Sequence, residues 1–215
     1  MKLYVYDHCP FCVKARMIFG LKDVPFELEI LLNDDEETPR RMTGVKSLPI
    51  LERDDGSFLG KSQDIIEEID RTHGAPVLDG PRNPELARWL KATSDTVLAL
   101  VIPRVPQAPF GEFATPEARA YFTEKKEAAF GRFDELRDQT STHLIDLERW
   151  LNELEPMIQS TEAVNGVLSQ DDIELFATLR QLSLVEGVQY PARVDAYRHA
   201  MAKLAQVPLN DEFAL

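Results

Sequence analysis

Two cysteines, Cys9 and Cys12, are the residues of this 215-residue chain best suited to covalent chemistry, and they are its only cysteines. Thiol–disulfide exchange needs a thiolate, and an ordinary cysteine with a pKa of about 8.5 supplies little of it at neutral pH. Pro10 predicts that a helix begins directly after Cys9. The unpaired N–H groups and the dipole of that helix start would stabilise a thiolate. We therefore expect Cys9 to be the nucleophile.

Cys12 follows one helical turn later, close enough to attack a mixed disulfide formed on Cys9. We expect it to be the resolving thiol, and to be more buried and less acidic than Cys9. His8, if protonated, and Lys14 or Arg16 would add positive charge. The alternatives are two ordinary core cysteines or half of a zinc site. A structural zinc site wants four ligands, whereas the chain has no second cysteine pair and its four histidines show no ligand spacing. We expect no metal.

The elements around this pair predict an α/β domain over residues 1–74. The patterns that carry this prediction are a strand at 2–6, a helix at 10–19 stopped by Gly20, a strand at 24–30, a helix starting near the acidic run 34–37, strands at 48–52 and 57–59 around an Asp55-Gly56 turn, and a helix capped by Ser62 and ended by Gly74. The order βαβαββα is that of a thioredoxin-like domain.

The remainder of the chain predicts an all-helical domain. Residues 75–83 are rich in proline and read as a linker, so that the second domain spans 84–215. Apolar residues at helical spacing recur through this part, and three prolines at 103, 106 and 109 mark an irregular connection. Ser169 with Asp172 predicts a helix start close to a capping box.

The composition excludes several classes of partner. Lys and Arg total 24 against 37 Asp and Glu, which gives a formal net charge of −13. Without a basic patch to neutralise phosphates, we expect no nucleic acid partner. No run of about 20 apolar residues is present, so we expect no membrane span, and the N-terminus does not read as a signal peptide. The expected compartment is the cytoplasm.

A second candidate feature is Leu48-Pro49 at the start of a predicted strand. A proline in a central strand removes a hydrogen bond of the sheet. It is tolerated if the bond is cis and the Leu48 backbone faces a ligand. A trans-proline on an edge strand is the alternative, and the spacing alone does not separate the two.

The Cys-Pro-Phe-Cys motif at 9–12, together with Leu48-Pro49 and Ser62, resembles the site of a dithiol glutaredoxin. The helical domain that follows, with Asn165-Gly166 and LSQDDI at 168–173, resembles the C-terminal domain of glutathione S-transferases. The combination, including YDHCPFCVKARMIFGLK, LLNDDEETP and NGVLSQDDIELF, resembles the bacterial glutaredoxin 2 family. This resemblance covers most of the chain. It implies a thioredoxin-like N-terminal domain followed by an all-α domain of the glutathione-transferase type.

The resemblance also implies glutathione as reductant and a glutathione-binding set of Cys9, Phe11, Leu48, Pro49, Lys61 and Ser62. Leu48 would pair through its backbone with the cysteinyl part of glutathione, and Ser62 would receive the γ-glutamyl carboxylate. Glutathione transferases usually have Glu or Gln before that serine, whereas this chain has Lys61. Lys61 would either pair with the carboxylate or be solvated. Phe11 would line the groove, pack against the second domain, or simply lie on a helix face.

The function that these residues indicate is a glutathione-dependent thiol–disulfide oxidoreductase, a glutaredoxin that reduces protein disulfides and glutathione mixed disulfides through Cys9 and Cys12. A cysteine-type glutathione transferase or dehydroascorbate reductase would use Cys9 alone. A non-enzymatic binding module on the same fold would need neither cysteine, and an iron–sulfur carrier would usually have glycine where Pro10 stands. Expected partners are glutathione and glutathionylated or disulfide-bonded proteins. The resemblance suggests a monomer.

Overall fold

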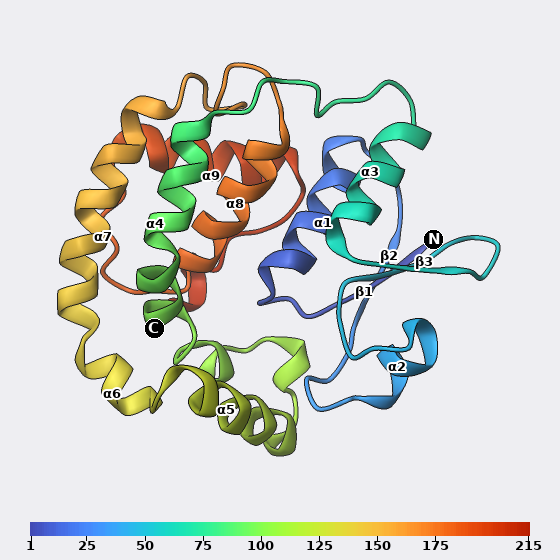
Figure 1. Ribbon diagram of the computed structural model, residues 1–215, viewed down its shortest axis with the longest axis horizontal. Helices are drawn as coiled ribbons and strands as arrows, with labels where there is room; N and C mark the ends of the chain where they lie inside the picture. The colour runs from blue at the N-terminus through green and yellow to red at the C-terminus, as the bar shows by residue number, and fades with distance from the viewer.

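A mixed four-stranded sheet forms the first part of the chain in the computed structural model, which describes all 215 residues (Figure 1). The strands are β1 (Lys2–Val5), β2 (Glu27–Ile30), β3 (Ile50–Glu52) and β4 (Phe58–Gly60), in the spatial order β2-β1-β3-β4. β1 is parallel to β2 and antiparallel to β3, and β4 is antiparallel to β3. The Asp55-Gly56 turn joins the last two strands, with Gly56 at a φ of +80° that favours glycine.

Three helices accompany the sheet: α1 (Pro10–Leu21), α2 (Glu37–Thr43) and α3 (Ser62–Thr72). Their order with the strands is the predicted βαβαββα, so the α/β prediction for this part is confirmed. α1 is the central helix of the molecule, because it packs against α3 on one side and against the helical part on the other. Most of its side chains are consequently buried, including Val13, Met17 and Phe19.

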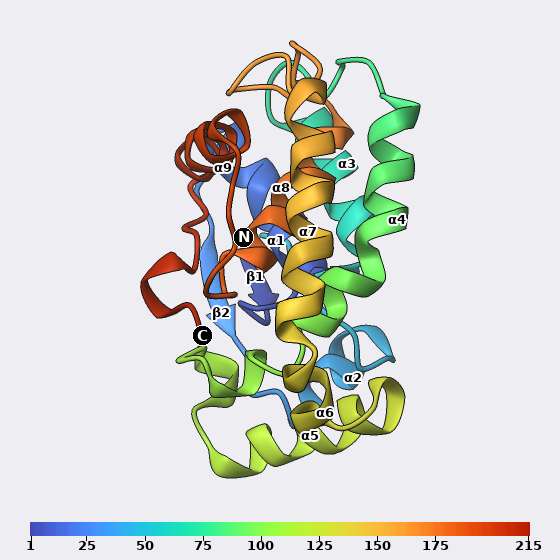
Figure 2. The same ribbon diagram turned by 90° about the vertical axis from the view of Figure 1, so that its left-hand side faces the viewer.

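The rest of the chain is helical, as predicted. Its helices are α4 (Pro84–Val101), α5 (Pro116–Phe130), α6 (Phe133–Asp138), α7 (Thr140–Leu154), α8 (Gln170–Leu182) and α9 (Ala192–Leu204). The proline-rich connection after α4 contains two short 3-10 helices, η1 (Val105–Gln107) and η2 (Gly111–Phe113); two more, η3 (Glu155–Met157) and η4 (Asp211–Phe213), follow later. The predicted capping box of Ser169 and Asp172 at the start of α8 is present. Figure 2 shows α4 and α7 side by side along one flank of this bundle.

The segment between α3 and α4 contains residues 75–83, which we propose as the boundary between two domains. It runs over one end of the molecule (Figure 1) and is tied to both sides. The backbone N–H of Val77 donates to the Asp70 carboxylate at 2.9 Å, and that of Gly80 to the Leu168 carbonyl at 2.8 Å. No helix in the structure combines the length and the apolar character that crossing a membrane requires.

Gly20 does not stop the first helix, which corrects our expectation. α1 continues through Gly20 to Leu21. The glycine is instead required by a close approach between the two parts of the chain. A Cβ atom at this position would lie 1.9 Å from the backbone oxygen of Ala205, directly after α9. The helical propensity of glycine is poor, but only hydrogen fits in this contact.

We expect Gly20→Ala to lower the free energy of unfolding by about 1–3 kcal/mol, because the added methyl group overpacks a contact between backbones. Urea denaturation would measure it. Gly60→Ala is the matched control, since its Cβ would meet only the Thr43 Cγ2 atom at 3.7 Å, an ordinary contact. Equal losses in both variants would contradict the steric explanation.

Candidate active site

The strand register brings the candidate site residues to one end of the sheet. β1 ends at Val5 and leads through Asp7 and His8 to Cys9. Ile50 of β3 pairs with Tyr4 and also with Gly60 of β4. The residues that precede Ile50 and follow Gly60 therefore extend beyond the same edge at which β1 ends. These are Leu48-Pro49 and Lys61-Ser62, so the three predicted parts of the site converge there.

Cys9 occupies the N-cap of α1, with φ −75° and ψ 122°, and Pro10 is the first helical residue. Cys9 is half-buried, whereas Cys12 in the first turn is fully buried. The Cys12 sulfur accepts a hydrogen bond from the backbone N–H of Tyr6 at 3.4 Å. Neither cysteine forms a disulfide in this structure. One thiol thus faces the surface of the site and the other lies behind it.

The two thiols have opposite acidities. A hydrogen bond from the Cys12 thiol, the electrostatic effect of His8 and the N–H groups of Cys12 and Phe11 lower the pKa of Cys9 to about 6, against the effect of burial. Burial and the neighbouring Cys9 raise the pKa of Cys12 well above its ordinary value. At neutral pH the pair therefore holds one thiolate, on Cys9, and one thiol, on Cys12.

Alkylation of Cys9 by iodoacetamide should follow this acidity. Because only the thiolate reacts, we expect the rate to rise as the pH increases through about 6 and to level off above it. Cys12 should stay unlabelled in the folded protein over the same range. A rate that rises only near pH ~8.5, the ordinary value, would contradict an activated Cys9.

The Leu48-Pro49 peptide bond is cis, which resolves the alternative left open by the sequence. Leu48 and Pro49 are both buried. Ser62 is not the cap of α3, contrary to our expectation, but its first helical residue; the cap position is held by Lys61. Lys61 has a φ of +65°, which non-glycine residues rarely adopt and which is found preferentially at functional sites.

Phe11 is not part of the packed core, because 56% of its surface is exposed. Its ring lies on the outside of α1 with the Lys14 ammonium group 5.3 Å from the ring centre. Lys61 is also exposed and Ser62 is half-buried, and Lys61 forms no ion pair. The side chain of Lys61 is therefore free to meet an anion or water.

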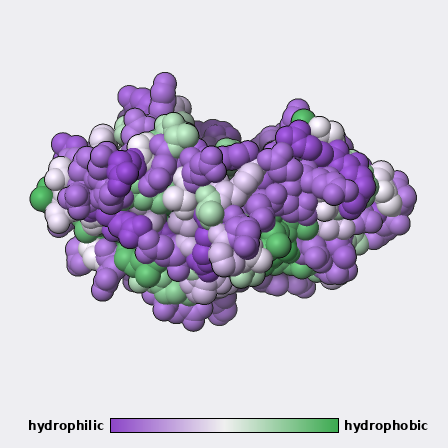
Figure 3. All heavy atoms as spheres, turned by 90° about the horizontal axis from the view of Figure 1, so that it is seen from below, coloured by the Kyte–Doolittle hydropathy of each residue, from purple (hydrophilic) through white to green (hydrophobic).

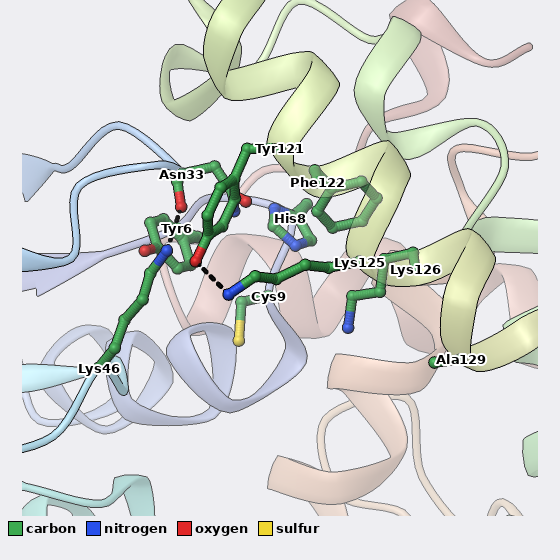
Figure 4. A pocket seen from close by; sticks show the side chains of 10 residues that line it. All are labelled: Tyr6, His8, Cys9, Asn33, Lys46, Tyr121, Phe122, Lys125, Lys126 and Ala129. Carbon is green, nitrogen blue, oxygen red and sulfur yellow. Dashed lines mark hydrogen bonds between the residues drawn. The ribbon is translucent and has the colours of Figure 1, made fainter.

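A cavity of about 370 Å³ opens beside Cys9, between the sheet domain and α5 (Figure 4). It is lined by Tyr6, His8, Cys9, Asn33, Lys46, Tyr121, Phe122, Lys125, Lys126 and Ala129. Phe11, Leu48, Pro49, Lys61 and Ser62 are absent from this lining. Cys9 is thus shared by a cavity toward α5 and by the sheet edge that carries the other candidate residues.

Lysines give this cavity a positive rim in a chain of net charge −13. The Lys46 ammonium group donates to the Asn33 carbonyl at 2.7 Å and lies 3.8 Å from the Tyr121 ring centre. Lys125 donates to the Tyr121 hydroxyl at 2.5 Å (Figure 4) and also pairs with Glu36 at 3.2 Å. Of the three lysines that line the cavity, only Lys125 pairs with a carboxylate, and the cavity lining itself contains no acidic residue.

The two residues before Cys9 are both held by charged groups of the helical part. The Asp7 carboxylate pairs with Arg16 of α1 and, at 2.8 Å, with Arg180 of α8. Burial would raise the pKa of Asp7, but Arg180 and Arg16 hold it below its ordinary value. His8 lies 2.6 Å through Nδ1 from the buried carboxylate of Glu112 in η2. Contacts between domains therefore fix the loop that presents the nucleophile.

Sequence reasoning missed Lys46, in the loop between α2 and β3, and the side of the site that the helical part supplies: Glu112, Tyr121, Phe122, Lys125 and Lys126. A local signal for them is absent, since lysines and aromatic residues on a helix are ordinary. Their role follows only from docking α5 and η2 against a loop more than a hundred residues earlier in the chain, as the His8–Glu112 separation of 104 shows.

The fold and the paired thiols define a class: a thiol–disulfide oxidoreductase site on a thioredoxin-like domain with an attached helical domain of the glutathione-transferase type. Residues 85–214 match the family model described as the glutaredoxin 2 C-terminal domain, and residues 3–77 match the N-terminal domain of glutathione S-transferase. The chain is 47% identical to glutaredoxin 2 of Escherichia coli K12 over 215 residues, which cover both chains completely. It belongs to the glutaredoxin 2 family.

Solved structures agree. The glutaredoxin 2 from Salmonella typhimurium, determined in complex with glutathione, is 48% identical and superposes with a TM-score of 0.98 over 100% of this chain and 98% of the other. Glutathione transferase GSTFuA3 from Phanerochaete chrysosporium is only 16% identical, with a TM-score of 0.70 over 94% and 96% of the two chains. The second likeness reflects the shared fold alone.

Proposed function

We propose that this protein is a glutathione-dependent thiol–disulfide oxidoreductase in which Cys9 is the nucleophile and Cys12 the resolving thiol. The observation that carries this proposal is a half-buried Cys9 at the start of α1, whose pKa is lowered to about 6, beside a fully buried Cys12. This is the asymmetry that an exchange reaction between two thiols requires.

The reaction follows from this asymmetry. The Cys9 thiolate attacks one sulfur of a substrate disulfide, a new S–S bond forms to Cys9, and the other substrate sulfur leaves as a thiolate that takes up a proton. With a glutathionylated protein the product is Cys9–glutathione, which a second glutathione thiolate releases as glutathione disulfide. With a protein disulfide, Cys12 loses its proton and attacks Cys9, which frees the reduced protein and leaves a Cys9–Cys12 disulfide. Two glutathione molecules then reduce that disulfide.

For glutathione we propose a site along the sheet edge, formed by Cys9, Phe11, Leu48, Pro49, Lys61 and Ser62. The first turn of α3 begins at Ser62 and offers unpaired N–H groups to a carboxylate. The unpaired ammonium group of Lys61 would approach the same carboxylate. The glutathione bound to the Salmonella typhimurium relative supports this assignment of the ligand.

For the protein part of a substrate we propose the cavity on the α5 side of Cys9. Apart from Cys9, its lining excludes the residues assigned to glutathione, so a mixed disulfide has room for one half on each side of the reacting sulfur. We further propose that the protein acts as a monomer in the cytoplasm. The chain has no cysteine outside the active-site pair from which a structural disulfide could form, and the face that includes α5 is mostly hydrophilic, with apolar side chains in small separate groups (Figure 3).

Cys12→Ser separates this function from that of a cysteine-type transferase or dehydroascorbate reductase on the same fold. We expect the variant to retain deglutathionylation, which needs only Cys9, and to lose reduction of protein disulfides, which needs both thiols. The two activities would be measured with a glutathionylated peptide and with a protein disulfide in the presence of glutathione. Unchanged activity toward both substrates would contradict the dithiol mechanism.

A further inference from the structure

Glu112 is a buried carboxylate with a single cationic candidate for a partner. It lies in η2 of the helical part and is 0% exposed. Its Oε1 atom accepts a hydrogen bond from the His8 backbone N–H at 2.9 Å and lies 2.6 Å from His8 Nδ1. The Oε2 atom is buried without a hydrogen-bond partner. No lysine or arginine lies within ion-pair distance of Glu112, so His8 is the one group that can pair with it directly, while Arg180 of the neighbouring Asp7 cluster acts on it from farther away.

The surroundings keep both groups in place. The His8 ring is packed among Tyr6, Phe110, Phe113 and Phe122, with ring centres 5.3–6.2 Å away. The Glu112 carbonyl accepts from the backbone N–H of Asn33 at 2.9 Å, which ties η2 to the loop after β2. The Glu112 side chain is fully buried in the contact between the two domains, and the His8 ring reaches the surface only where it lines the cavity.

A buried carboxylate is costly unless it is paired with a cation. Protonation of His8 supplies that cation, and no further charged group has to be buried because His8 already lies against Glu112. His8 directly precedes Cys9 in the chain, and both residues line the same cavity (Figure 4). The imidazolium would therefore lie beside the Cys9 thiol. We propose that Glu112 is a positioning residue that holds His8 as an imidazolium beside Cys9, so that the helical domain activates a thiol carried by the other domain. This inference rests on the proposed role of Cys9 as nucleophile.

The other charged groups around His8 and Glu112 have partners of their own, so they do not replace His8 as the partner of Glu112. Arg16 and Arg180 both pair with Asp7. Lys125 is paired with Glu36, and Lys126 lies 5.6 Å from the Phe122 ring centre. The Tyr6 hydroxyl is buried without a partner, and burial raises the pKa of Tyr6, so it stays neutral. Lys46 of the same cavity donates to the Asn33 carbonyl and lies over the Tyr121 ring.

Glu112→Gln provides a test because it would change the pKa of Cys9 in two opposite ways. The direct effect is the loss of the negative charge of Glu112, and the indirect effect is the loss of the positive charge that Glu112 holds on His8. The negative charge of Glu112 is among the causes that raise the pKa of Cys12, so its removal alone would make the thiols more acidic. Loss of the His8 imidazolium would make Cys9 less acidic. We expect the indirect effect to prevail and the pKa of Cys9, read from the pH dependence of iodoacetamide labelling, to rise by about one unit.

The partner variant is His8→Asn, whose amide can still donate toward Glu112 but carries no charge. It should raise the pKa of Cys9 to a similar extent. In the double variant, Glu112→Gln should add no rise to that of His8→Asn, because the two residues act through one charge. Glu85→Gln removes an exposed carboxylate that pairs with Arg88 on α4, and should leave the pKa of Cys9 unchanged.

An unchanged or lowered pKa of Cys9 in Glu112→Gln would overturn the inference, and so would a rise of equal size in the His8→Asn background. A wild-type Cys9 of ordinary acidity would instead refute the activated thiol of the proposed function. If Glu112→Gln does not fold, the wild-type protein supplies the test. Nitrogen NMR shifts should show both ring nitrogens of His8 protonated at pH 7, and a neutral ring would contradict the proposal.

Discussion

Cys9→Ser is expected to abolish both exchange reactions, because a serine hydroxyl cannot form the S–S bond through which each of them passes. We expect turnover with a glutathionylated peptide and with a protein disulfide to fall by about 10³-fold or more, to the level that glutathione alone supports. The half-buried position of Cys9 makes a folding defect a poor explanation for such a loss.

Cys12→Ser is the matched control, since it removes the second thiol of the same motif and should retain deglutathionylation. Urea denaturation of both variants would verify that each is folded. Substantial activity of Cys9→Ser toward either substrate would contradict the assignment of Cys9 as the nucleophile, whatever the behaviour of Cys12→Ser.

The second large effect is expected at Asp7, the carboxylate that joins the two domains next to the site. Asp7→Asn would leave the guanidinium groups of Arg180 and Arg16 without a charge partner, and their side chains are only 2% and 8% exposed. Removing one partner of a buried ion pair typically costs about 3–5 kcal/mol, because the remaining charge stays buried. We expect the free energy of unfolding at pH 7 to fall by this amount.

The pH dependence of wild-type stability offers a further reading of the same cluster. The pKa of Asp7 is lower in the folded protein than in the unfolded chain. The contribution of Asp7 to the free energy of unfolding is therefore complete above its pKa in the unfolded chain, about 3.9. It is lost as the pH falls through its pKa in the folded protein. Arg88→Ala, which breaks an exposed pair with Glu85, should change stability by no more than about 0.5 kcal/mol. Similar losses in Arg88→Ala and Asp7→Asn would contradict the role of burial.

Features with a local cause could be predicted from the sequence. Pro10 marks the start of α1, Asp55-Gly56 marks the hairpin, and Ser169 with Asp172 marks the start of α8. Each of these signals arises within four residues of chain. The cysteine motif is of the same kind, because Cys9 and Cys12 are brought together by a single helical turn. Its chemistry could therefore be assigned before the fold was known.

Features that depend on docking could not be predicted in this way. Gly20 resembles a helix stop in sequence, but the structure uses it to admit the backbone of Ala205. Ser62 resembles a helix cap, yet the left-handed φ of Lys61 moves the cap back by one residue. Glu112 and the lysines of α5 carry no signal at all until the two domains meet. The nucleophile was thus visible in the sequence, whereas the groups that tune it were not.

The central claim is that Cys9 exchanges directly with glutathione, whereas the buried Cys12 takes no part in that step. The most direct measurement is peptide mapping by mass spectrometry of Cys12→Ser after incubation with glutathione disulfide at neutral pH, where Cys9 is a thiolate. We predict a stable mixed disulfide with glutathione on Cys9, and its removal on addition of reduced glutathione. A folded Cys12→Ser protein whose Cys9 remains free of glutathione would contradict the account.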